Sequence, residues 1–564
     1  MNTDEKDVEV AEEADISLNA SLADSQSTFG DVRYRDFDDE KAAKDNLSDD
    51  RYEDTEEPRL KYDRLSSDIK GILSSGDSAS ALAVHDKFIV VGTQWGKLYL
   101  LDALGNDLSQ NQPQFGRDGQ HTHSVAVSQI SIDHSGEYVA SCSTDGRVII
   151  TGLYTSENNY SFNNKRPVFS VALDPIFGRT GSGRRFMIGD DNGVTMYEKS
   201  GFLNRYKSST LSDGTDGPIK LIKWRGRFAA WWSKKGVVVY DVVHEKIISI
   251  IKFGPILQES DVEREKMTCR IAWSDQKSLF ISYGDTVRIC HVCRRDPNDP
   301  KSRELPQYMV EILYTVPLEG FWISGVAPMD KLIVLLTTPK VVVQEGEDAE
   351  DDKPQLMIIE PIEDDYNLIS TDYLCLKDHD KHSIHDLNLE YLLEDQYYFI
   401  VSPNDIFFGK PRDEDDHVDW LILQQEYEKA LSYTESHVKQ LHRFSIYTVG
   451  RQYINYLIEN CEFDQAGALL SRVFLGEKRL WEEEILRFIR LNKVAAIGPY
   501  VPLGRTKNQI KLDPLVYEGV LIAFLKLEPR EDEIFLDLVW DWPPELYEVS
   551  RLVDLVLNQL LGTV

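Results

Sequence analysis

Residues 397 to 431 read YYFIVSPNDIFFGKPRDEDDHVDWLILQQEYEKAL, and the period of the apolar residues changes within this stretch. Two short apolar runs, Tyr397 to Val401 and Ile406 to Phe408, flank a Pro-Asn-Asp turn, which predicts a strand, a turn and a second strand. Beyond the charged segment 410–416, apolar residues recur at the spacing of a helical face, namely at Val418, Leu421, Ile422, Tyr427 and Leu431. The sequence therefore predicts β structure before this segment and α structure after it.

Length and charge limit the class of protein. A chain of 564 residues is too long for one compact core, so we expect at least two domains. The net charge of −33 argues against binding to a nucleic-acid backbone. Residues 1–57 hold 20 Asp and Glu against 6 Lys and Arg, and we predict that residues 1–65 form a disordered acidic tail.

The sequence also indicates a cellular compartment. Its start lacks the basic residues and the apolar segment of a signal peptide, and it contains no apolar run long enough to span a membrane. Six cysteines in a chain of this length do not suggest a disulfide framework, so we expect a reducing, cytosolic environment.

A hairpin pattern repeats from about residue 70 onward. Each repeat has an apolar strand, a polar turn with glycine and a second apolar strand, and the repeats cover 88–102, 138–152, 186–198, 228–241 and 279–290. Their turn glycines are Gly96, Gly146, Gly193, Gly236 and Gly284. The spacings of 50, 47, 43 and 48 residues are typical of the blades of a β-propeller with loop insertions.

Two further blades would close a seven-bladed ring, and six blades remain an alternative. One blade pairs residues 331–337 with 355–360, around an acidic insertion at 345–352 that we expect to be a mobile loop. The other uses the strands of the opening stretch, with Asn404 and Asp405 in its turn, and we expect the strand at 78–84 to complete it. The predicted propeller domain covers residues 66–411.

Residues 412–564 are predicted to begin an α-solenoid. Helical faces run through 418–436, 445–459, 464–474, 479–491, 513–526, 530–540 and 544–561, separated by Gly and Pro. Short consecutive helices suggest stacked antiparallel pairs. Because no polar capping helix follows, we expect a fragment or a short isoform. The residues Asp415, Asp416, His417, Asp419 and Trp420 are predicted to form the joint between the two domains.

Two motifs suggest metal ligands, but each has a simpler explanation. Cys290 and Cys293 form a Cys-x-x-Cys pair without the second pair that a zinc site requires, and they continue a predicted strand. His379, His382 and His385 recur at every third residue, and we favour a solvated loop for them. We therefore predict a non-enzymatic protein with no catalytic, metal or cofactor site.

Three further motifs suggest binding. Arg225 and Arg227 lie among aromatic residues in WRGRF, where they could bind an anion or a partner carboxylate, and we favour a strand start with a β-turn. The segment 181–185, GSGRR, has the composition of a phosphate loop without the following helix. The segment 540–544, WDWPP, could be a proline-recognition ligand, and we favour a corner between two helices.

Several long segments resemble the vacuolar protein sorting-associated protein 41 family. They are VSPNDIFFGKPRDEDDHVDWLILQQEYEKAL, IKLIKWRGRFAAWWSKKGVVVYD, SVAVSQISIDHSGEYVASCSTDGRV, LNKVAAIGPYVP and LDPLVYEGVL, and the similarity spans roughly residues 75–545. The resemblance implies a WD-repeat-like propeller followed by clathrin-heavy-chain or TPR-like helical repeats. The family's C-terminal RING-type zinc domain has no counterpart in these residues, which puts functions of that half in doubt.

The resemblance implies binding rather than catalysis. Members of this family are subunits of the HOPS tethering complex. This complex joins late endosomes, autophagosomes and AP-3 vesicles to the lysosome or vacuole before their membranes fuse. The implied partners are other HOPS subunits, a Rab-type or Arf-like small GTPase bound directly or through an adaptor, and the AP-3 adaptor complex. The implied location is the cytosol and the surface of late endosomal and lysosomal membranes.

Two other functions are compatible with parts of the sequence. A vesicle-coat or cargo-sorting scaffold for the lysosomal or regulated secretory route would use the same propeller and solenoid. A metal- or redox-dependent enzyme would use Cys290, Cys293 and the histidines at 379–385. The sequence does not identify which residues bind a partner.

Overall fold

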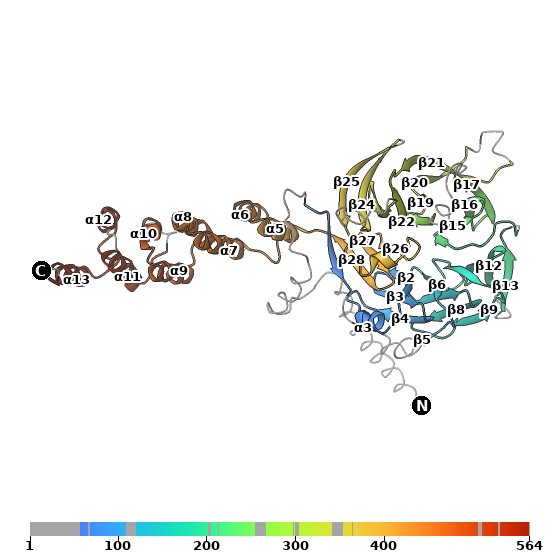
Figure 1. Ribbon diagram of the computed structural model, residues 1–564, viewed down its shortest axis with the longest axis horizontal. Helices are drawn as coiled ribbons and strands as arrows, with labels where there is room; N and C mark the ends of the chain where they lie inside the picture. Colours follow the sequence, from blue (N-terminus) through green and yellow to red (C-terminus); the bar gives the residue numbers. More distant parts are fainter. Residues whose placement is uncertain are drawn as a thin grey trace, which may run out of the picture. The chain divides into compact units, whose positions relative to one another are not determined.

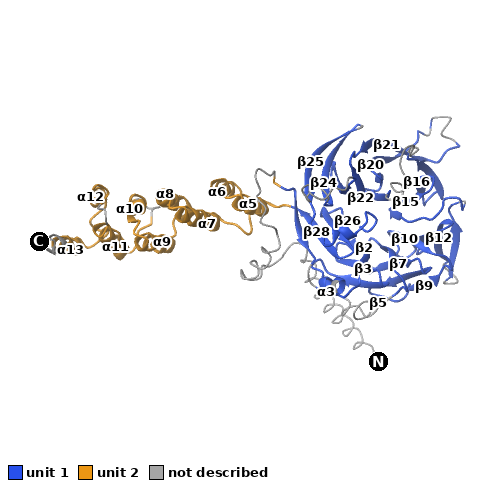
Figure 2. Cartoon of the chain, in the orientation of Figure 1, with its two compact units in different colours: residues 1–49, 58–411 blue, residues 50–57, 412–564 orange. Residues whose placement is uncertain are grey.

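The computed structural model describes residues 57–65, 68–108, 120–200, 205–212, 214–253, 267–296, 298, 304–340, 353–363, 365–505, 510–527 and 531–562. They form two compact units, residues 58–411 and residues 412–562 together with Glu57 (Figure 2). Residues 1–56 of the predicted tail and the predicted acidic loop 345–352 lie outside the described residues.

The first unit is a seven-bladed β-propeller, as the described residues show and as the sequence predicted (Figure 1). Each blade is a four-stranded antiparallel sheet. The first three blades are β2 (Ala79–His85), β3 (Phe88–Thr93), β4 (Lys97–Leu101) and β5 (Gln120–His121); β6 (Val127–Ile132), β7 (Tyr138–Ser143), β8 (Arg147–Gly152) and β9 (Tyr160–Asn163); and β10 (Val168–Leu173), β11 (Phe186–Asp190), β12 (Gly193–Ser200) and β13 (Arg205–Thr210).

The remaining blades follow the same plan. They are β14 (Ile222–Arg225), β15 (Phe228–Ser233), β16 (Gly236–Asp241) and β17 (Lys246–Ile251); β18 (Cys269–Trp273), β19 (Ser278–Tyr283), β20 (Thr286–Arg294) and β21 (Tyr308–Pro317); β22 (Phe321–Met329), β23 (Leu332–Pro339), β24 (Gln355–Ile362) and β25 (Asp365–Tyr373); and β26 (Asn388–Leu392), β27 (Tyr397–Ser402), β28 (Asp405–Pro411) and β1 (Leu60–Arg64). Two short helical elements, α3 (Asp68–Ser74) and η3 (His379–Lys381), lie in connections.

The middle strands of the blades are apolar on both faces because each blade packs between two others. All residues of β3 and β7 are buried, for example. The apolar clusters accordingly combine residues of neighbouring blades, such as Val90 of β3 with Val127 and Val139 of the next blade. A strand buried on both faces has a continuous apolar run rather than an alternating one, which is what the repeats in the sequence show.

The ring is closed by β1, whose residues were predicted to belong to the disordered tail. Strand β1 pairs antiparallel with β28 from Leu60 opposite Pro411 to Arg64 opposite Phe407. Leu60 is 1% exposed, and the Tyr62 hydroxyl donates to the Asp372 carboxylate at 2.6 Å. The prediction that residues 78–84 complete the last blade was therefore wrong, since these residues form β2, the innermost strand of the first blade.

The second unit is helical. Its elements are α5 (Glu414–Leu423), α6 (Tyr427–Ser436), α7 (Ile446–Glu459), α8 (Phe463–Phe474), α9 (Lys478–Arg490), α10 (Val494–Ile497), η4 (Gly498–Tyr500), α11 (Pro514–Leu525), α12 (Asp532–Asp541) and α13 (Val549–Gly562). One apolar cluster joins residues from α5 to α13, including Leu421, Trp481, Phe488, Tyr517 and Leu552. None of the described helices is long and apolar enough to span a bilayer.

The helix predicted at 418–436 is in fact two helices. The chain leaves the helical conformation at Gln425, whose φ is 60°. A left-handed residue interrupts the helical hydrogen bonds even where the apolar spacing continues on either side. The sequence pattern indicated the buried face correctly and missed the break.

We predict that Leu60→Ala destabilises the propeller by about 3 kcal/mol, because it removes a buried side chain from the strand that closes the ring. Denaturant unfolding of the full chain, followed by tryptophan fluorescence, measures the change. Asp63→Ala is the matched control on the same strand, because the Asp63 carboxylate is 56% exposed. Equal stability of the two variants would contradict a closing role for β1.

Candidate functional site: the central channel of the propeller

The predicted turn residues occupy equivalent places in the blades. The five glycines lie at the hairpin turn between the second and third strands of a blade, and Asn404 and Asp405 lie at the corresponding turn between β27 and β28. Gly96 shows why glycine is needed, because its φ is 77° and a Cβ atom there would be 2.3 Å from the His123 carbonyl oxygen. These residues shape the blades and do not line the two channel cavities described below.

A buried Ser–His–Asp arrangement that no sequence motif indicated lies beside Gly96. The His123 imidazole lies 2.9 Å from the Ser141 hydroxyl and 3.5 Å from the Asp145 carboxylate. The His123 side chain is fully buried and Ser141 is 1% exposed, so no substrate reaches them. Asp145 also accepts hydrogen bonds from the backbone of Ser124 and Arg147, which ties the turn to the preceding loop. The arrangement holds the fold together.

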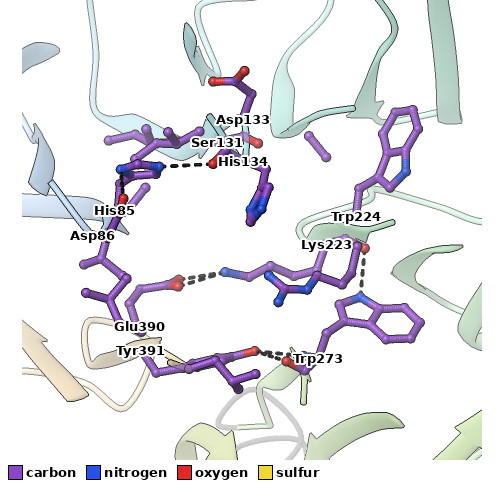
Figure 3. Close-up of a pocket in the computed structure, with 18 of the residues that line it drawn as sticks. His85, Asp86, Ser131, Asp133, His134, Lys223, Trp224, Trp273, Glu390 and Tyr391 are labelled. Carbon is purple, nitrogen blue, oxygen red and sulfur yellow. Dashed lines mark hydrogen bonds and ion pairs between the residues drawn. The ribbon is translucent and has the colours of Figure 1, made fainter. Parts of the chain in front are cut away.

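Two cavities lie along the channel enclosed by the innermost strands. The carboxyl-end cavity, of about 290 Å³, is lined by residues at the ends of these strands, including His85, Asp133, Trp224, Arg225 and Trp273 (Figure 3). The amino-end cavity, of about 190 Å³, is lined by residues at their beginnings, including Ala79, Ser128, Lys220, Arg270 and Asn388. The two cavities therefore lie at opposite ends of the same strands.

A polar layer separates the two cavities. Gln129, Lys223, Glu390 and Tyr391 line both of them. The Lys223 ammonium of β14 pairs with the Glu390 carboxylate of β26 at 2.8 Å and 3.0 Å. This pair joins the fourth blade to the seventh across the channel (Figure 3).

The phenol of Tyr391, a partly buried residue, forms a second connection across the channel. Its hydroxyl accepts from the Trp273 backbone N–H at 2.8 Å and donates to the Trp273 carbonyl at 2.9 Å (Figure 3). Burial raises the pKa of Tyr391, so the phenol stays neutral and can donate. Arg270, whose pKa burial lowers, donates to the carbonyls of Ser324 and Leu387. These bonds fix the walls of both cavities.

The two arginines of WRGRF have different surroundings. Arg227 makes two hydrogen bonds of 2.8 Å to Asp241 and lies 4.7 Å from the centre of the Tyr308 ring. Its role is structural, since a buried carboxylate with a bidentate partner fixes the hairpin. Arg225 instead lines the carboxyl-end cavity together with Trp224.

The cysteine and histidine motifs lie in separate parts of the propeller. Cys290 and Cys293 are both in β20, where burial raises the pKa of Cys290 to about 12 and keeps its thiol protonated. His379 begins the short turn η3 before β26, and His385 is exposed. Within the described residues, no three His, Cys, Asp or Glu side chains are grouped so that they could hold a metal ion.

The glycine–arginine segment and the tryptophan–proline segment also have structural roles. Arg185 pairs with the buried Asp174 at 2.7 Å in the loop before β11. Trp542 is buried at the corner between α12 and α13, 5.5 Å from the Tyr517 ring. Trp540, in contrast, is 85% exposed at the end of α12.

The residues predicted to form the joint lie in α5, the first helix of the second unit. The Asp415 carboxylate accepts from the backbone N–H groups of His442, Arg443 and Phe444 at 2.9 to 3.0 Å. Asp416 completes a capping box with Asp413.

Three further residues were predicted for the joint. His417 lies 2.6 Å from the Glu57 carboxylate. Trp420 packs partly buried against the helical core, and Asp419 is half-buried. In the structure the carboxylates of Asp415 and Asp416 therefore organise the start of the helical unit.

We predict that the unfolding free energy of the propeller falls as the pH is lowered from about 7.5 to about 5.5. Burial lowers the pKa of His123 in the folded protein, an effect that Asp145 only partly opposes. As the pH falls, His123 therefore takes up a proton in the unfolded chain but not in the folded one. The free energy of unfolding decreases below the histidine pKa of the unfolded chain, which is about 6.5. Urea unfolding at several pH values measures the slope.

The histidine responsible can be tested by substitution. His123→Gln should make the pH dependence shallower, although the variant itself is less stable. His385→Gln, at an exposed position, is the control and should keep the original slope. An unchanged slope in a folded His123→Gln variant would contradict the assignment.

Comparisons with known proteins agree with this architecture. The family model described as Vps42 beta-propeller, which carries the name Vps41, matches residues 60–410, and the model of the Vps41 TPR-like region matches residues 448–562. The chain is similar to the vacuolar protein sorting-associated protein 41 homologs of Danio rerio, Homo sapiens and Solanum lycopersicum, with identities of 35%, 34% and 29%.

Each of these similarities covers 86% of this chain and 53%, 53% and 51% of the respective relatives. The chain thus spans about half the length of the curated relatives that it matches. The family model of the propeller alone covers more than half of the chain, from the closing strand β1 to β28. The protein belongs to the Vps41 family.

Proposed function

We propose that this protein acts in vesicle-mediated transport to the lysosome or vacuole, as a non-enzymatic subunit of the HOPS tethering complex. The observation that carries the proposal is that family models named for Vps41 match both units of the chain. The relatives are named for vacuolar protein sorting, and the transport of late endosomal, autophagosomal and AP-3 vesicles is the role proposed for this chain.

The structure supports a binding role for the propeller. Its blades form a closed ring stiffened by the Lys223–Glu390 pair and the Tyr391 hydrogen bonds. A rigid ring presents loops and strand ends in a fixed arrangement, which lowers the conformational cost of binding. We propose that this unit binds a Rab-type or Arf-like GTPase, directly or through an adaptor, and the AP-3 complex, at the membrane surface.

The helical unit exposes apolar side chains on one face of each of two helices, α12 and α13. Leu536 and Trp540, 53% and 85% exposed, lie one turn apart on α12. Val549, Val553 and Leu557, between 43% and 49% exposed, share one face of α13 at the same spacing. Exposed tryptophan and aliphatic side chains at helical spacing are suited to packing against helices of a partner. We propose that these apolar faces of α12 and α13 contact other HOPS subunits.

We predict that Trp540→Ala lowers the recovery of HOPS subunits with this chain by about tenfold, because truncating an interface tryptophan removes a large contact area. The experiment co-expresses the tagged chain with the remaining subunits and quantifies each after affinity purification. Leu423→Ala is the control, because Leu423 is 65% exposed on α5, far along the sequence from α12.

The two outcomes of this experiment are separable. Equal recovery with both variants would contradict the apolar face of α12 as the contact. Failure of the unaltered chain to recover any HOPS subunit would contradict the proposed membership itself.

We also predict nucleotide-dependent capture of a small GTPase by the propeller unit. Late endosomal and lysosomal GTPases, locked in the GTP or the GDP state, are immobilised and exposed to the purified chain with and without a candidate adaptor. Retention on the GTP form alone is the expected result. Equal retention on both forms, or none with a folded chain, would contradict direct GTPase binding.

A further inference from the structure

Arg225 is a cationic side chain that faces a cavity. It is the last residue of β14, it is half-buried, and it lines the carboxyl-end cavity. Its guanidinium has no hydrogen-bond or ion-pair partner among the residues that the structure describes. Arg227, only two residues later, has its carboxylate partner in Asp241. A half-buried guanidinium has already lost part of its hydration, so an anion that reaches it binds more strongly than at an open surface.

The other charged groups deep in the cavity are already engaged. Lys223 pairs with Glu390 at 2.8 Å. The carboxylate of Asp133 is 1% exposed and accepts from the backbone N–H groups of Glu137 and Tyr138, both at 2.9 Å. The cavity lining therefore leaves one permanent cation available to a ligand within the described part of the chain, at Arg225.

Two tryptophan side chains lie in the same cavity as Arg225, and hydrogen bonds fix their positions. Trp224 and Trp273 line the same cavity. The Trp273 indole donates to the Lys223 carbonyl at 3.2 Å, and its backbone is fixed by Tyr391 at 2.8 Å. The Trp224 indole donates to the Gly226 carbonyl at 3.1 Å. A cavity of about 290 Å³ with a polar floor has room for one or two side chains of a peptide.

The acidic side chains at the rim of the cavity favour a carboxylate over a phosphate as the bound anion. Glu394 and Asp395, which follow β26, are exposed and line the cavity, and so does the exposed Asp86, whose carboxylate contacts the His85 imidazole. The carboxylates of Glu394 and Asp395, which line the same cavity as a single guanidinium, repel a phosphate, which carries up to two negative charges, more than a carboxylate, which carries one. The same two carboxylates attract a basic residue on the segment that carries the carboxylate.

We propose that the carboxyl-end cavity binds a peptide segment of a partner protein through one Asp or Glu side chain seated on Arg225, with a basic residue of the same segment facing Glu394 and Asp395. The guanidinium donates two parallel hydrogen bonds to the carboxylate, and the indoles of Trp224 and Trp273 exclude water around the pair. The inference rests on the proposed function only in treating the propeller as a partner-binding unit.

The experiment uses arrays of short synthetic peptides with random flanking residues and a fixed central residue, which is Glu, its neutral analogue Gln or phosphoserine. The purified full chain is labelled and its binding to each array is quantified. We expect Glu peptides to bind more strongly than their Gln counterparts, with Lys or Arg enriched among the flanking residues. For the best Glu peptides, Arg225→Gln should weaken binding by about tenfold.

Two further variants keep the result interpretable. Arg225→Lys retains the positive charge but lacks the paired N–H donors of the guanidinium. Its affinity for Glu peptides should therefore lie between those of the unaltered chain and Arg225→Gln. Arg179→Gln is the matched control, because Arg179 is an exposed arginine of the same unit that lines neither cavity. Thermal melts establish that each variant is folded.

Specific results would overturn the proposal. These are equal binding of Glu and Gln peptides, stronger binding of phosphoserine peptides, or Glu-dependent binding that survives in folded Arg225→Gln. Because the assay contains neither a GTPase nor a HOPS subunit, its failure leaves the results of the recovery and capture experiments unaffected. Failure of those experiments would likewise leave the peptide result standing.

Discussion

The propeller depends on the hydrogen bonds between its first strand and its last one. Strand β1 pairs with β28 over five residues, and Arg64 adds an ion pair of 3.1 Å with the buried Asp405. Burial raises the pKa of Asp405, while Arg64 opposes this effect and keeps a partner beside the carboxylate. A ring without this pairing would expose the edge of β28, whose free N–H and C=O groups invite pairing with other chains. The closure of the ring around the two cavities therefore depends on a short strand at the start of the described residues.

Features that are local in the sequence could be predicted, and those that require a distant partner could not. The hairpins were evident because the strands and the turn glycine of each repeat are contiguous. Strand β1 was not, because LKYDR contains few apolar residues and follows a strongly acidic segment. Its strand conformation comes from β28, which follows more than three hundred residues later. The break at Gln425 was missed for a related reason, since the apolar spacing on either side continues across it.

In the candidate site, too, local features could be predicted from the sequence and contacts between distant residues could not. The sequence suggested that WRGRF could bind an anion, without separating its two arginines. Alternation along a strand would place Arg225 and Arg227 on one face. Gly226, with a φ of 53°, turns the chain between them, so one arginine lines the cavity and the other pairs with Asp241. Similarly, nothing in the sequence places Lys223 beside Glu390, because that contact exists only once the ring has closed.

Building one blade from both ends of the propeller sequence has a consequence for synthesis. The ring cannot close on the ribosome until the residues of β28 have left the exit tunnel, and by then translation of the helical unit has begun. At about 5 to 20 residues per second, the earlier blades wait for tens of seconds with an open end. A helical unit with its own core can fold while the ring is closing. A nascent chain of this protein therefore presents strand β1 without its partner to chaperones while the blades are translated, whereas a chain whose blades are each built from consecutive strands leaves no strand waiting in this way.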